Sequence, residues 1–177
     1  HGHINAIGFE LYMKLLEQTI RELKGEKVED KVQVNIDLCI DIQIPEHYID
    51  DSNQRLWLYK RISSVSDETV LKGLKGEIVD RFGNYPSSVS NLFEYGRLRL
   101  RAQQLKILSV ERKGSKLFLK FREDTPISRQ HIIELVGQSR HLSLSPEGIL
   151  AAELSISSPN GIIEKVHTLL DQIAVLE

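Results

Sequence analysis

The sequence has very little cysteine and no long apolar run. Cys39 is the single cysteine among 177 residues, so the chain cannot form an internal disulfide, and we expect a reducing compartment. Nowhere does the sequence contain the roughly 20 consecutive apolar residues that a membrane-spanning helix needs. The first residues also lack the charged and apolar segments of a secretory signal. These absences predict a cytoplasmic protein without a membrane partner.

The motifs of nucleotide-binding and catalytic proteins are missing as well. The sequence contains neither G-x-x-x-x-G-K-[ST] nor G-x-G-x-x-G, so it offers no phosphate-binding loop. Cys39 lies between Asp37 and Asp41 without a histidine at a motif spacing, which favours a packing residue over a nucleophile. The histidines are scattered and lack the partners of a metal site: His1, His3, His47, His131, His141 and His167. We therefore expect no catalytic residue, no cofactor and no metal. A small hydrolase built on the acidic residues around Asp37 and Asp41 is kept as a formal alternative.

The chain also lacks an excess of positive charge. Its net charge of -2 and its isoelectric point near 6.3 argue against a dedicated nucleic-acid binder, because such domains usually carry a basic excess. Basic residues do gather locally, at Arg97, Arg99 and Arg101 and around 106–122. A module that contacts nucleic acid through this helix and the 107–122 hairpin is therefore the alternative function.

The overall composition is that of an ordinary globular protein. Hydrophobic residues make up 41% and charged residues 27% of the sequence, which predicts one folded domain with an appendage. Apolar residues recur at helical spacing up to residue 24, and the highly charged residues 25–33 indicate a linker. We expect a separate helix at 1–24, a linker at 25–33 and a domain at 34–177.

Hydrophobic periodicity predicts an α+β fold for the domain. A strict alternation from Val34 to Ile44 indicates a strand that Pro45 ends. Gly114-Ser115 indicates the tight turn of a hairpin. The remaining expected elements are a helix capped by Ser52 or Asn53 and ending near Ser66, helices at 68–82 and 86–106, a helix capped by Ser128, strands at 142–144 and 150–156, and a helix capped by Ser158 or Asn160. Helices should pack on a small, mostly antiparallel sheet.

The helix at 68–82 presents a polar side opposite its apolar stripe. At about 100° per residue, Glu77, Asp80 and Arg81 fall together on one side of this helix and should point to solvent. Glu77 and Arg81 stand four residues apart, so a simple helix-stabilising ion pair accounts for part of the pattern. A contact face for another protein is the alternative interpretation. Gly73 and Gly76 lie in the same helix and lower its intrinsic stability.

Four motifs in series carry a resemblance to a known family. They are GFELYMKLLE at 8–17, IPEHYI at 44–49, RLWLYKRI at 55–62 and EIVDRFG at 77–83, followed by Pro86. In this order they resemble the C-terminal part of bacterial transcription-repair coupling factors. The resemblance implies that residues 1–24 are the tail of a helicase-type motor's translocation motif, and that residues from 34 onward are a regulatory domain.

The resemblance also implies a function and partners. In this family the regulatory domain docks on the module that recruits the excision-repair protein UvrA, and hides it until the motor engages stalled RNA polymerase. Glu77, Asp80 and Arg81 match the family positions that contact this module. The resemblance further implies a parent protein that binds RNA polymerase, DNA and UvrA and hydrolyses ATP with magnesium. The fragment itself is then non-catalytic and autoinhibitory.

Overall fold

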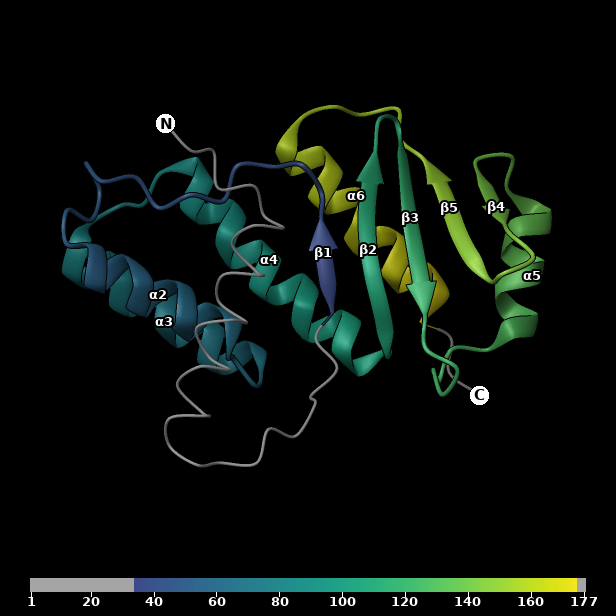
Figure 1. Ribbon diagram of the computed structural model, residues 1–177, viewed down its shortest axis with the longest axis horizontal. Helices are drawn as coiled ribbons and strands as arrows, with labels where there is room; N and C mark the ends of the chain where they lie inside the picture. Colours follow the sequence, from purple (N-terminus) through teal and green to yellow (C-terminus); the bar gives the residue numbers. More distant parts are fainter. Residues whose placement is uncertain (1–33, 175–177) are drawn as a thin grey trace.

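The computed structural model describes residues 34–174, and this range contains five strands and five helices. Figure 1 shows the sheet at one end of the long axis and the pair of helices α2 and α3 at the other. The elements are β1 (Asn35–Asp37), α2 (Ser52–Ser63), α3 (Glu68–Phe82), α4 (Ser87–Gln104), β2 (Ile107–Lys113), β3 (Lys116–Phe121), α5 (Arg129–Gln138), β4 (Leu142–Leu144), β5 (Ile149–Glu153) and α6 (Pro159–Ile173).

The sheet has the strand order β1-β2-β3-β5-β4. Only β1 and β2 run parallel, and the other three pairs are antiparallel. The predicted hairpin is confirmed, because β2 and β3 meet at a tight turn in which Gly114 has a φ of 61°. A positive φ is readily adopted by glycine, which has no Cβ. The predicted α+β class with a mostly antiparallel sheet is therefore confirmed.

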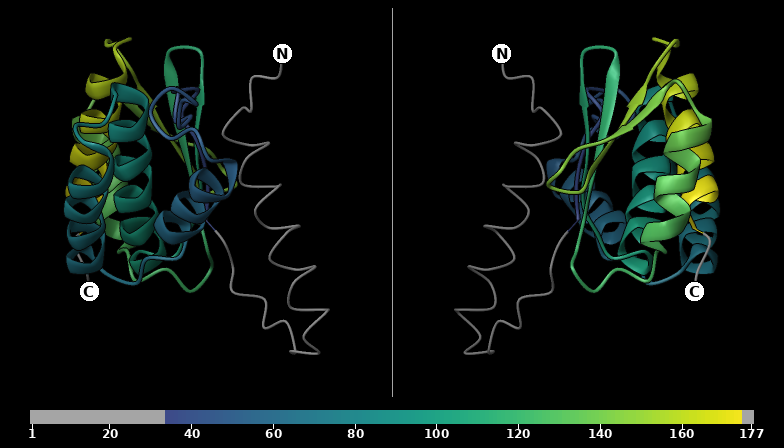
Figure 2. Two further views of the ribbon diagram at one scale, coloured as in Figure 1. Left: turned by 90° about the vertical axis from the view of Figure 1, so that its left-hand side faces the viewer. Right: turned by 90° about the vertical axis from the view of Figure 1, so that its right-hand side faces the viewer.

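Helix α4 is the centre of the helical layer. It runs from the α2–α3 end of the molecule to the sheet, and α4, α5 and α6 lie on the same side of that sheet (Figure 2). Phe93, Leu98 and Ala102 of α4 are fully buried or nearly so. Gly96 marks the close approach of α2, since a Cβ at this position would stand 2.8 Å from Ile62 Cγ2. This contact fixes α2 against the core.

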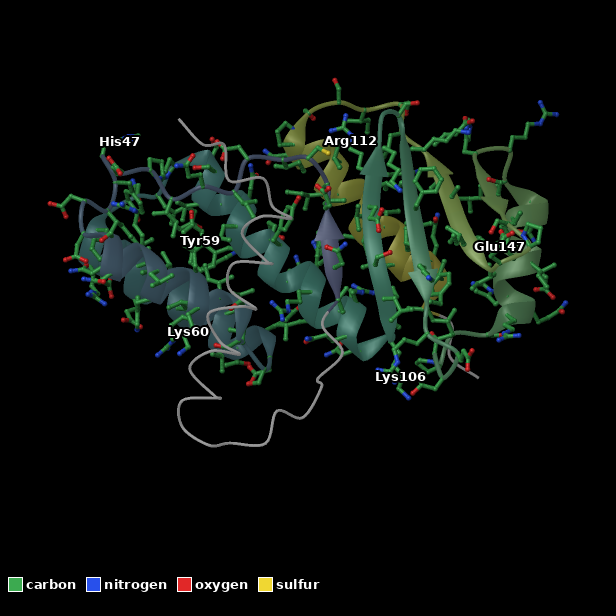
Figure 3. The ribbon with its side chains drawn as sticks, in the orientation of Figure 1. His47, Tyr59, Lys60, Lys106, Arg112 and Glu147 are labelled. Carbon is green, nitrogen blue, oxygen red and sulfur yellow. The ribbon has the colours of Figure 1, made fainter. Side chains whose placement is uncertain are left out.

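The predicted strand from Val34 to Ile44 is wrong beyond Asp37. The alternation of buried and exposed residues does continue to Ile44, but the backbone leaves the sheet and Cys39 adopts a φ of 54°. Side chains of α2 and α4 take over the hydrogen bonds that a neighbouring strand would make. Leu38 N donates to Tyr95 Oη at 3.0 Å and Ile44 N to Tyr59 Oη at 2.6 Å; Figure 3 shows Tyr59 on the α2 side of this segment.

Helix ends follow the capping chemistry with small shifts. Asp51, rather than Ser52 or Asn53, caps α2, because its carboxylate accepts the N–H of Gln54. This helix ends at Ser63 instead of near Ser66. Ser128 and Ser158 cap α5 and α6 as predicted.

No helix among residues 34–174 is both long enough and apolar enough to span a bilayer. The predicted helix at 1–24 and linker at 25–33, with His1 and His3, lie outside the described residues.

Candidate interaction surface

Helix α3 is a well-anchored platform for the polar residues that it carries. Asp67 caps its first turn by accepting the Val70 N–H at 2.9 Å, and this bond lowers the pKa of the Asp67 carboxyl. Leu71, Leu74 and Ile78 bury its inner side. At the other end the helix stops at Gly83, whose φ is 76° and whose carbonyl accepts a hydrogen bond from Tyr48 Oη at 3.0 Å. The helix is thus capped at its start and tied to the Tyr48 segment at its end.

The polar side of α3 carries the three residues singled out from the sequence. Asp80 and Arg81 are exposed and Glu77 is half-buried, so all three reach the surface. Glu77 and Arg81 form the expected ion pair, with 3.2 Å between Oε1 and Nη1. Asp80 has no ionic partner among the described residues. We call this set the α3 face.

A tryptophan on the neighbouring helix extends the α3 face. The guanidinium of Arg81 lies 5.3 Å from the ring centroid of Trp57, and that of Arg61 lies 5.4 Å from the same ring. Arg81 also covers the ring of Phe82 at 5.0 Å. Sequence reasoning missed the participation of Trp57 and Arg61. The signal that was available is the RLWLYKRI motif itself, in which Arg61 follows the only tryptophan of the chain by one helical turn.

The three arginines of the alternative hypothesis do not form one cationic surface. Arg97 bonds Glu68 at 3.2 Å and lies 3.8 Å from Glu94, while Arg101 pairs with Asp171. Arg99 is half-buried and lies about 200° around the helix from Arg97, given 100° per residue. The basic hairpin residues are also spread out, since Lys106 and Arg112 lie at opposite ends of β2 (Figure 3). Binding of nucleic acid therefore stays a prediction, and the basic residues that would carry it do not lie together on one surface.

A shallow groove of about 340 Å³ runs between α4 and α6. Among the residues that line this groove, Glu94 has the most strongly shifted pKa. The contact with His167, then the hydrogen bond and charge of Lys75 and the charge of Arg97, lower the pKa of Glu94 to about 2, against the opposing effect of burial. Lys75 Nζ stands 3.1 Å from Glu94 Oε1, and His167 Nε2 stands 3.4 Å from Oε2. Glu94 at the groove therefore links α4 to Lys75 of α3 and to His167 of α6.

The described residues offer little for catalysis or metal binding. Burial, followed by the neighbouring Asp37 carboxylate, raises the pKa of the Cys39 thiol, which disfavours the thiolate that a nucleophile requires. Asp37 and Asp41 each accept a backbone N–H two residues ahead, from Cys39 and Gln43, which is a turn-forming role. No group of three metal-ligating side chains occurs within 34–174.

Comparison with known families identifies the domain. The family model described as the TRCF domain matches residues 38–132, a stretch that includes α2, the α3 face, α4 and the hairpin. The chain belongs to the TRCF domain family. The resemblance inferred from the four motifs is therefore confirmed, and the family match continues past the last of those motifs.

The relatives of this TRCF domain are much longer proteins. The transcription-repair-coupling factor of Bacillus subtilis is 34% identical over 152 residues, and that of Escherichia coli is 35% identical over 149 residues. These alignments cover 84% and 81% of this chain but only 13% of each relative. A crystal structure of the C-terminal domain of transcription-repair coupling factor shares the fold, with a TM-score of 0.67 and 23% identity, covering 84% of this chain and 99% of that domain.

Proposed function

We propose that residues 34–177 are an autoinhibitory protein-interaction domain, and that its parent is a DNA-translocating ATPase that couples stalled transcription to nucleotide-excision repair. In this proposal the domain is non-catalytic and its α3 face docks on the UvrA-recruiting module of the same polypeptide, which it masks. The parent's motor would use ATP and magnesium, and the parent's partners would be RNA polymerase, DNA and UvrA. Membership of the TRCF domain family supports this assignment, because the relatives of this chain are named for coupling transcription to repair.

One observation carries the proposal. Glu77, Asp80 and Arg81 reach the surface together from a helix that is capped at its start and tied down at its end. Charged groups at an interface set its register and orientation, and rim charges cost little to separate from their partners. Such a contact suits a masking interaction, because a lock must bind the closed state better than the open one and still release.

The test is the affinity between the 177-residue chain and the separately expressed UvrA-recruiting module of its parent. Glu77→Ala with Asp80→Ala and Arg81→Ala should weaken binding by about 2 kcal/mol or more, which is roughly thirtyfold, because truncated interface charges leave their partners unpaired. Isothermal titration calorimetry measures this directly. Circular dichroism should show an unchanged helical content, since all three side chains lie outside the buried stripe of α3.

A matched control tests whether net charge alone explains the result. Glu123→Ala with Arg129→Ala and Glu134→Ala changes the net charge by the same amount at exposed positions. These residues lie at or near α5, at the opposite end of the molecule from α3 (Figure 1). This variant should bind like the wild type. Equal affinity of the wild type and the α3-face variant would refute the proposed function.

A further inference from the structure

Trp57 occupies an unusual position for the only tryptophan of the chain. It is half-buried on α2, and the guanidinium groups of both Arg61 and Arg81 contact its ring. No described residue accepts a hydrogen bond from its indole N–H. Tryptophan and arginine are the residue types that most often supply the binding energy of protein interfaces, and a buried indole usually has an acceptor for its N–H. The indole is therefore a half-buried group whose N–H is not used by any described residue.

The core does not depend on this indole to hold α2 in place. Leu58 and Ile62 are buried on the inner side of the helix, and Ile62 packs against α4 where Gly96 allows close approach. Tyr59 connects the same helix to Ile44 N. Trp57 also packs one side against this core, but because the fully buried residues anchor α2, the part of the indole that stays accessible is available to a partner.

The charges around Trp57 have a defined order. Arg61 and Arg81 each contact the Trp57 ring, and Arg81 pairs with Glu77. Asp80 follows on the same side of α3, beyond Glu77. The two inner charges, Arg81 and Glu77, neutralise each other at 3.2 Å. The two outer charges, Arg61 and Asp80, have no ionic partner among residues 34–174. The surface thus has an apolar centre on α2, an unpaired cation on one flank and an unpaired anion on the other.

We infer that the docking surface continues from the α3 face onto α2, with Trp57 as its apolar anchor. The surface takes a protein partner that presents an apolar recess for the indole, a carboxylate opposite Arg61 and a cationic side chain opposite Asp80. This inference rests on the proposed function, since the occupant to which it commits is the UvrA-recruiting module. Within this surface Arg81 positions the indole and pairs with Glu77, in addition to any contact of its own.

A spectroscopic experiment tests the role of Trp57 without altering it. Because the chain has one tryptophan, labelling with 5-fluorotryptophan gives a single fluorine resonance. Titration with the UvrA-recruiting module should shift or broaden that resonance along the same binding curve that calorimetry measures. A purely structural tryptophan on α2 would leave the resonance unchanged while the module binds, and this result would overturn the inference.

Substitutions on α2 supply a second, independent test. Arg61→Glu should weaken the affinity for the module at least tenfold, because it places a carboxylate opposite a carboxylate. Lys60→Glu is the matched control, since Lys60 is an adjacent exposed cation with the same charge change, and it should alter the affinity less than twofold. Trp57→Ala should weaken binding at least tenfold and Trp57→Phe less so. If Trp57→Ala does not fold, the fluorine resonance and the Arg61 and Lys60 pair still decide the matter.

The outcomes of these experiments distinguish a failure of the inference about α2 from a failure of the proposed function. If Glu77, Asp80 and Arg81 are needed for binding but the α2 variants bind normally, the docking surface is confined to α3 and the inference is wrong. If the α3-face variant binds like the wild type, the proposed function itself is wrong.

Discussion

Glu94 shows how a single carboxylate can join three helices. It projects from α4, and it meets Lys75 of α3 and His167 of α6 within 3.4 Å. Its pKa of about 2 is well below the ordinary value of 4.5, so folding favours the ionised form. A group with a lowered pKa in the folded state adds stability that is complete above its unfolded pKa and is lost as the pH falls toward its folded pKa. The contribution of Glu94 should therefore disappear between about pH 4.5 and pH 2.

Glu94→Gln is expected to lower the free energy of unfolding at pH 7 by about 1–2 kcal/mol. This loss is smaller than the pKa change alone would give, because the cluster is partly exposed and neither ring nitrogen of His167 makes an aligned hydrogen bond. Urea unfolding at pH 7 and at pH 3 measures the loss. The difference between wild type and variant should shrink at the lower pH. Glu164→Gln, at an exposed position in the same groove, is the control and should change little at either pH. A difference that stays constant with pH would contradict this account.

Sequence reasoning identified single residues well where their partners lie on the same element. The pair of Glu77 and Arg81 and the capping role of Ser128 followed from spacing within one helix. The contact of Trp57 with two arginines did not, because Arg61 and Arg81 come from different helices and their convergence depends on how α2 packs beside α3. The lowered pKa of Glu94 was missed for the same reason. Local spacing cannot report contacts that tertiary packing creates.

At the scale of elements, the glycines of α3 have different surroundings from the glycine of α4. A Cβ at Gly73 or Gly76 would meet no atom within 4 Å, and neither residue has a positive φ. Both therefore weaken the helix without serving its packing, and both leave open space on the outer side of α3. Gly96, by contrast, is needed for the contact between α4 and Ile62.

Gly73→Ala with Gly76→Ala should stabilise the domain by about 1–2 kcal/mol in total, since each alanine restricts the unfolded chain and favours the helix. Gly96→Ala should instead destabilise it by about 1–3 kcal/mol, because the new methyl group would overlap Ile62. Urea unfolding of the two variants gives opposite signs if this is correct. A loss of stability in the α3 variant would show that Gly73 and Gly76 have a conformational role in the fold.

The segment from Leu38 to Ile44 defines the limit of pattern-based prediction for elements. Its period of two correctly predicted which side chains are buried, because any extended chain lying on a core alternates in this way. It did not predict that Tyr59, Asn91 and Tyr95 would satisfy the backbone in place of a strand. The sequence of the segment alternates in the same way whether side chains or a neighbouring strand bond its backbone.

At the scale of the whole molecule, the class of fold was predictable and the order of strands was not. Alternation, the hairpin turn and the caps predicted the α+β class and its mostly antiparallel sheet. The parallel pairing of β1 with β2 joins residues separated by three helices, and no local feature of β1 specifies that distant partner. The same limit applies to the candidate site, whose α3 part lies on one helix and whose α2 part does not.

The domain boundary gives a prediction at this scale. Deletion of residues 1–33 should leave a chain that unfolds cooperatively, with a free energy of unfolding within about 1 kcal/mol of that of the full chain, because β1 and the buried cluster of the described residues are all retained. Deletion of residues 1–41 removes β1 and the buried Val34, Ile36, Leu38 and Ile40, and should abolish cooperative unfolding. Thermal scans of both truncations provide the comparison. Equal stability of the two would place the boundary elsewhere.

The extended segment that follows β1 also has a mechanical meaning. It is attached to the sheet at Asp37, to α4 and α2 through Tyr95 and Tyr59, and at its far end Tyr48 bonds the carbonyl of Gly83 at the end of α3. A pull on the chain at Val34 is therefore carried by a continuous tether to the terminus of the helix that bears Arg81. The pairing of β1 with β2 takes such a load first, and the α3 face is reached through the tyrosine hydrogen bonds that follow.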